Sequence, residues 1–116
     1  MAAQLAAVRR RADELEALRD EVEAVRGSAR SALGEVDVLV DARGRLVRLR
    51  LGDRACTLRP AVLAKLVEDT VRSAAASAQS TAVALAEQRF GRGSQVAALV
   101  RADLAPASAR ASSLAP

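Results

Sequence analysis

The chain has 116 residues, a net charge of +4, 51% hydrophobic residues and one aromatic side chain, Phe90. Much of the apolar fraction is alanine, so a one-domain monomer would have a thin core, and dimerisation is the simplest way to enlarge it. The single Cys56 excludes an internal disulfide and, like most free cysteines, is expected to be buried. No signal peptide and no apolar stretch of about 18 residues is present, so we expect a cytoplasmic protein without a membrane span.

Residues 2 to 26 have the pattern of an amphipathic helix. Val8, Leu15 and Val22 recur every seven residues, with Leu18 and Val25 beside them, as in a coiled coil. The opposite face is charged, and arginine–acid pairs four residues apart can stabilise it. These pairs are Arg9 with Asp13, Arg10 with Glu14, and Arg19 with Glu23. Gly27 is suited to end the helix.

Residues 35 to 51 predict a β-hairpin, after a loop or short edge strand at residues 27 to 34. The turn Asp41-Ala42-Arg43-Gly44 has residues favoured at the first and last turn positions. A four-residue connection pairs Val40 with Arg45 and gives one aliphatic face, which a flanking helix or a second subunit must cover. The expected pairs are Val38 with Val47, Val36 with Leu49, Asp37 with Arg48, and Glu35 with Arg50.

Residues 55 to 58 are expected to be extended, and a long helix to run from Pro60 to Phe90. Proline suits the first helical turn, and Thr57 and Arg59 are both candidate start positions. The apolar stripe comprises Leu63, Leu66, Val67, Thr70, Val71 and Ala74. Residues 73 to 86 carry no charge, which favours packing against a partner helix. Gly91 and Gly93 end the helix, residues 95 to 104 predict a short apolar helix, and residues 106 to 116 a disordered tail.

Several of these features resemble the YbaB/EbfC family of bacterial nucleoid-associated proteins, in an actinobacterial version. The resemblance consists of a glycine before a V-x-V-x-V strand, a D-x-x-G-R-L turn, a strand ending L-R-L, and an L-x-P helix start. These residues are Gly34, Val36, Val38, Val40, Asp41, Gly44, Arg45, Leu46 and the segments 49–51 and 58–60. The resemblance implies an α+β fold in which two long helices flank a small antiparallel sheet, in the order α-β-β-β-α. The third strand would lie at about residues 28 to 32.

The resemblance further implies a family domain over residues 1–93, an intertwined, tweezer-like homodimer, and binding of duplex DNA on the nucleoid. Residues 94–116 then form the short helix and the tail. The candidate dimer-interface residues are Val36, Val38, Val47, Leu49, Leu66, Val67 and Val71.

No catalytic signature, metal site or cofactor motif is present, so we expect no enzyme. Histidine is absent, and the glycines around Arg92 lack the strand and the Gly-Lys-Ser of a phosphate loop. Paired carboxylates such as those at residues 68 and 69 lie on a helix face expected to be solvated.

The basic residues are the remaining candidates for a site. Residues 41 to 72 carry eight basic and four acidic side chains, and within them Arg48 and Arg50 have acidic cross-strand neighbours. The candidate DNA-binding residues are Arg9, Arg10, Arg11, Arg43, Arg45, Arg54, Arg59, Arg89 and Arg92. Because no aromatic side chain is interleaved with them, phosphate contact is favoured over base stacking.

Two hypotheses follow. The first is a homodimer that binds duplex DNA with little sequence preference through arginine–phosphate contacts. The second is an adaptor or secretion-associated interaction module that does not bind DNA, and whose residues 73–86 or tail bind another protein. A contiguous basic surface would favour the first, and arginines matched one by one to acids would favour the second.

Overall fold

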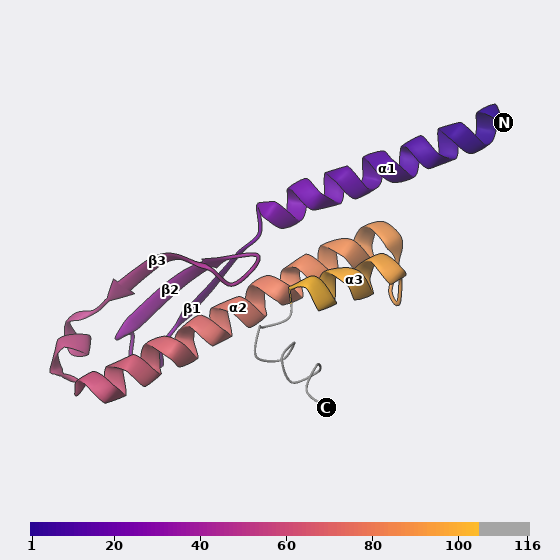
Figure 1. Cartoon of the computed structure of the whole chain (residues 1–116). Helices are drawn as coiled ribbons and strands as arrows, with labels where there is room; N and C mark the ends of the chain where they lie inside the picture. The colour runs from indigo at the N-terminus through magenta and orange to yellow at the C-terminus, as the bar shows by residue number, and fades with distance from the viewer. Residues whose placement is uncertain (105–116) are drawn as a thin grey trace.

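The computed structural model describes residues 1–104, and the tail expected at residues 106 to 116 lies outside them. The elements are α1 (Ala2–Glu23), β1 (Arg26–Arg30), β2 (Val36–Asp41), β3 (Leu46–Leu51), the 3₁₀ helix η1 (Asp53–Thr57), α2 (Pro60–Phe90) and α3 (Gln95–Asp103). The strands form one antiparallel sheet in the order β1-β2-β3. Figure 1 shows α2 running along one face of this sheet, while α1 extends away from it. The α-β-β-β-α order expected from the sequence is confirmed.

Helix α2 has the boundaries that its sequence predicts. Pro60 occupies the first turn and Arg59, with extended backbone, is the N-cap, which decides between the two candidate start positions. At the other end Gly91 has φ 91°, a conformation that glycine adopts without strain and other residues rarely do. The helix is therefore 31 residues long and reaches well past the sheet.

The core lies between the sheet and α2. Val36, Val38 and Val40 on the central strand have no exposed surface, and Ala74 and Ala78 on α2 are equally buried. The uncharged run at residues 73 to 86 packs against this sheet and, further along, against α3. The predicted partner for this run is therefore the sheet over its first half, and helices α1 and α3 of the same chain around Ala86.

Gly27 does not end α1, as its sequence position suggested. The helix ends at Glu23, and Gly27 lies inside β1, paired with Val40. A Cβ atom on Gly27 would lie 2.1 Å from the Ala74 carbonyl oxygen and 2.8 Å from the Ala78 Cβ. Glycine is required here because the backbone of β1 lies directly on α2. The strand expected at about residues 28 to 32 accordingly begins two residues earlier.

The hairpin register differs from the expected one by two residues. Val36 pairs with Leu51 and Val38 with Leu49, and a β-bulge near Val40 brings that residue opposite Leu46. From Val36 to Leu39 the shift of two keeps the side chains on their predicted faces, because side chains alternate with a period of two. At the bulge the shift is one, so Leu46 takes the position on the aliphatic face that was predicted for Arg45. The aliphatic face is therefore confirmed, whereas the predicted cross-strand partners are wrong.

The turn between β1 and β2 is built around Glu35, which is buried. Its Oε1 accepts hydrogen bonds from Ser31 Oγ at 2.9 Å and from the Leu33 N–H at 3.1 Å. The Ser31 hydroxyl also accepts one from the Val36 N–H at 2.9 Å. Hydrogen bonds from its own backbone N–H and from Ser31 hold the pKa of Glu35 below its ordinary value. The charged form of Glu35 thus fixes the start of the central strand.

Beyond the sheet, α1, α2 and α3 form a smaller apolar cluster. Leu18 of α1, Ala86 of α2 and Ala97 of α3 are buried together. At the C-terminal end of the heptad pattern Val22 and Val25 also pack within the chain, whereas Val8 is 65% and Leu15 40% exposed. A groove of about 700 Å³ runs between α1, α3 and the β2–β3 turn.

The segment after β3 was predicted wrongly in two respects. It forms the 3₁₀ helix η1 rather than an extended strand, and Cys56 on it is exposed rather than buried. Ala55 is the residue of this turn that packs inward, with 1% of its surface exposed. The periodicity of a four-residue segment is too short to distinguish these alternatives.

We expect Gly27→Ala to lower the free energy of unfolding by about 1–3 kcal/mol or more, because α2 must move to admit the methyl group. Urea unfolding followed by circular dichroism measures the change. Ser28→Ala is the matched control, because Ser28 is the next residue along β1 and is exposed. Equal stability of the two variants would contradict the close packing of β1 on α2.

Candidate nucleic-acid interface

The positive charge of the chain is concentrated in one segment. Residues 26 to 59, which contain the sheet and η1, carry eight arginines and four acids, an excess equal to the net charge of the whole chain. Helix α2 carries equal numbers of basic and acidic residues, and residues 1 to 25 have a net charge of −2. An anionic partner is therefore attracted mainly to the sheet and η1.

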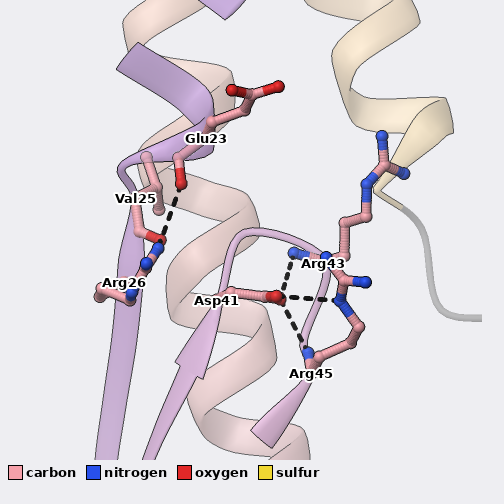
Figure 2. Close-up of polar contacts among 6 residues, drawn as sticks. All are labelled: Glu23, Val25, Arg26, Asp41, Arg43 and Arg45. Carbon is pink, nitrogen blue, oxygen red and sulfur yellow. Dashed lines mark hydrogen bonds and ion pairs between the residues drawn. The ribbon is translucent and has the colours of Figure 1, made fainter. Parts of the chain in front are cut away.

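The β2–β3 turn is organised by Asp41 (Figure 2). Its Oδ1 accepts hydrogen bonds from the Arg43 N–H at 3.0 Å and the Arg45 N–H at 2.9 Å, and its Oδ2 accepts one from Arg45 Nε at 2.9 Å. The side chain of Arg43 points toward α3, where it pairs with Asp103 at 3.2 Å. Arg43 and Arg45 are both candidate DNA-binding residues, and the structure shows that each has an acidic partner.

Partial burial of Asp41 acts to raise its pKa, but hydrogen bonds from Arg45 and Arg43 outweigh it and hold the pKa below its ordinary value. Nearby, Arg26 donates hydrogen bonds to the carbonyl oxygens of Glu23 at 3.1 Å and Val25 at 2.8 Å (Figure 2). These carbonyls follow the last turn of α1, where a cation is favoured. Both side chains therefore stabilise the junctions around the sheet.

The two candidate arginines near the end of α2 are also paired. Arg89 Nε donates to Glu21 Oε2 at 3.3 Å, and a second contact joins Arg89 Nη2 to the other oxygen. These hydrogen bonds lower the pKa of Glu21 and raise that of Arg89. Arg92 lies 3.9 Å from a Glu87 oxygen. Arg89 thus ties α1 to α2 across 68 positions of the sequence, which no local pattern could have indicated.

The three arginines at the start of α1 are exposed. Arg9 and Arg10 have no ion pair among the described residues, so the expected pairs with Asp13 and Glu14 are absent, whereas Arg19 pairs with Glu23 at 3.3 Å. Arg11 lies over the ring of Phe90, 4.9 Å from its centroid, a cation–π contact between α1 and the end of α2.

Arg48 and Arg50 on β3 were expected to be neutralised, and the structure shows otherwise. Arg50 lies opposite Asp37, but Asp37 pairs with Arg30 on β1 at 3.2 Å instead. Arg48 lies opposite Leu39. Both side chains are exposed and have no ion pair within residues 1–104. The alternation of polar and apolar residues along β3 already indicated that Arg48 and Arg50 lie on an exposed face. The incorrectly predicted register, however, gave each of them an acidic partner.

Arg54 on η1 and Arg59 at the N-cap of α2 are exposed, and neither has an ion pair in the described chain. The charge of Arg54 contributes to lowering the pKa of Glu35. Together with the two arginines of β3, they place four exposed cations between residues 48 and 59.

The candidate dimer-interface residues fall into two groups. Val36 and Val38 are fully covered by α2 within the chain, and Leu66, Val67 and Val71 are half-buried against the same core. Val47 and Leu49 are 52% and 39% exposed on β3, an edge strand. Leu46 and Leu51 on the same strand are about half exposed, so β3 presents four partly uncovered apolar side chains in succession along the sheet.

Comparison with known protein families identifies the family of this chain. The model of the YbaB/EbfC DNA-binding family matches residues 1–93. The chain belongs to this family. Comparisons with curated proteins and with solved structures found no match.

Within the YbaB/EbfC domain and α3, the described residues contain no group of histidine, cysteine and acidic side chains that could hold a metal ion. None of the described helices is long and apolar enough to cross a bilayer. The YbaB/EbfC family is a DNA-binding, nucleoid-associated family. The exposed arginines are therefore the candidate residues for DNA binding by this chain.

We expect Asp41→Asn to lower the free energy of unfolding at pH 7 by about 1 kcal/mol, because the charge-assisted hydrogen bond to Arg45 is lost. The folded-state pKa of Asp41 is lowered, so its contribution is complete above the ordinary value of 3.8 and is lost as the pH falls through the folded value. The variant should therefore lose less stability than the parent protein between pH 6 and pH 2. Urea midpoints across this range measure the difference, and parallel curves would contradict it.

Proposed function

We propose that this protein is a homodimeric, nucleoid-associated protein that binds duplex DNA with little sequence preference through arginine–phosphate contacts. The observation that carries the proposal is the basic excess on the sheet and η1, combined with membership of a DNA-binding family. Phosphate contacts supply affinity without reading the sequence, and arginine is well suited to make them. We place the protein on the nucleoid, in the cytoplasm.

Among the candidate arginines, the exposed side chains of Arg9, Arg10, Arg54 and Arg59 are available to phosphate without breaking an ion pair. Arg43, Arg45, Arg89 and Arg92 each lie within 4 Å of a carboxylate, so a phosphate would have to compete with it. Arg11 contacts Phe90 through its guanidinium. A domain that uses phosphate contacts and has one aromatic residue should prefer duplex over single-stranded DNA.

The homodimer is supported by the uncovered apolar side chains of β3. A single chain leaves Leu46, Val47, Leu49 and Leu51 between 39% and 52% exposed. An unpaired edge strand with such side chains is a template for association, and a two-fold dimer would bury the same surface on both copies. Dimerisation also doubles the number of arginines that can contact one duplex.

The alternative is an interaction module that does not bind DNA and that uses residues 73–86 or the C-terminal apolar stripe and tail. Ala74, Ala78 and Ala82 on the first segment have no exposed surface, so this face of α2 is used within the chain. Leu99 of the second segment is 63% exposed, and the ion pairs of Arg43, Arg45, Arg89 and Arg92 also favour the alternative. It therefore stays the second candidate function.

We expect the binding constant for an unrelated duplex to fall by about 100-fold between roughly 50 and 200 mM salt, the change that about four phosphate contacts produce. Fluorescence anisotropy of a labelled duplex measures it, with the single strand of the same sequence as control. A constant that hardly changes with salt, or tighter binding to the single strand, would count against arginine–phosphate binding.

We expect light scattering to give twice the chain mass of 12.1 kDa, and Leu49→Glu to give the single mass, because a buried charge at the interface is costly. Leu33→Glu is the matched control, since Leu33 is 66% exposed and lies in the β1–β2 turn rather than on β3. A parent protein that is monomeric at about 10 μM, or a Leu49→Glu variant that remains dimeric, would refute the role of β3.

A further inference from the structure

The sheet has a second face, on the side opposite α2, which we call the outer sheet face. Side chains alternate between the two faces along a strand. Each residue that packs on α2 is therefore followed by one that points to the outer sheet face. It comprises Arg26, Ser28 and Arg30 on β1, Asp37, Leu39 and Asp41 on β2, and Arg48 and Arg50 on β3. Figure 1 shows no helix over it. It is a continuous surface of three strands that the described chain leaves open.

The outer sheet face is basic, with four arginines and two aspartates. The central strand carries both acids, and each has an arginine bound to it: Asp37 has Arg30 at 3.2 Å and Asp41 has Arg45 at 2.9 Å. Arg26 is engaged by the carbonyl oxygens at the end of α1. Arg48 and Arg50 remain as the two cations of this face with neither an ion pair nor a side-chain hydrogen bond within residues 1–104.

We propose that the outer sheet face lies against the phosphate backbone of duplex DNA, with Arg48 and Arg50 as its principal phosphate contacts. The proposal rests on the proposed function and assigns a surface to it. It adds two residues that the sequence had assigned to internal pairing. The occupant follows from charge complementarity, because an exposed basic face with the acids already neutralised attracts a polyanion.

The spacing of the two arginines supports this assignment. They are two residues apart on one strand, which separates their Cα atoms by roughly 6.7 Å and points both side chains to the same side. Arg48 lies opposite Leu39, and Arg50 lies opposite Asp37, whose carboxylate is already paired with Arg30. Because the strand already fixes the backbone of both arginines, they lose less conformational freedom on binding than two arginines on a loop would.

Other surfaces of the described chain are less suited to a polyanion. Helix α1 carries six acids against four arginines, and α2 is neutral. The outer sheet face has no aromatic side chain, and its apolar residue, Leu39, is half-buried. It therefore fits phosphate better than unstacked bases or an apolar protein surface.

The test compares Arg48→Gln/Arg50→Gln with Arg19→Gln/Arg72→Gln in the full chain. Arg19 and Arg72 are also exposed, each lies on a helix, and each holds one surface ion pair, so the control removes the same charge at little cost in stability. Anisotropy with a labelled duplex of unrelated sequence is recorded at several salt concentrations between about 50 and 200 mM. We expect the slope of log K against log salt to become shallower by about 1 for each arginine lost from a phosphate, which is about 2 for each substituted position in a homodimer. The control pair should leave the slope unchanged.

Arg48→Lys/Arg50→Lys keeps both charges and should restore the slope, which separates loss of contact from loss of fold. Circular dichroism of each variant checks the fold as well. If the parent protein binds duplex with a steep salt dependence but Arg48→Gln/Arg50→Gln binds as tightly, the assignment of this face fails while the proposed function stands. If both glutamine pairs weaken binding equally, only net charge matters, and the assignment also fails. If the parent protein does not bind duplex at about 50 mM salt, both proposals fail together.

Discussion

The arrangement of the whole chain depends on the close approach of α2 to the sheet. At Gly27 there is no room for a Cβ atom between β1 and the backbone of α2 at Ala74. The alanines of α2 let the helix lie close to the valines of β2, which are completely buried. Small residues contribute little apolar area each, so this core is stabilised by closeness of packing rather than by large side chains. The uncharged stretch of α2 has its explanation in this contact.

Because α2 occupies one face of a three-stranded sheet, the other surfaces of the sheet are left for partners. The edge strand β3 presents apolar side chains such as Val47 and Leu49. The outer sheet face presents arginines instead. Alternation along the strands therefore gives the sheet an apolar face, which α2 covers over β2 and leaves partly open at β3, and a basic face on the other side. This division is what makes a dimer that also binds a polyanion physically reasonable for so short a chain.

The arginines differ in function according to where their acidic partners lie. Arg89 and Arg43 join elements that are distant in the sequence, the first to Glu21 of α1 and the second to Asp103 of α3. Such exposed or half-exposed pairs contribute little stability individually, yet they help to orient the helices around the sheet. The arginines on β3 take no part in these pairs. The basic character of the surface thus depends on which acids are already engaged, not on the number of arginines alone.

The sequence by itself determined the order of elements, the family, the bounds of α2 from Pro60 to Phe90, and the face on which the residues of the central strand lie. These features follow from local periodicity and from the special backbone properties of proline and glycine. Only the tertiary structure decided the β2–β3 register, the exposure of Cys56, the role of Gly27 and the partners of Arg43, Arg48 and Arg50. A bulge changes the cross-strand partners and locally interrupts the alternation, and an ion pair between distant segments leaves no trace in the spacing of either one.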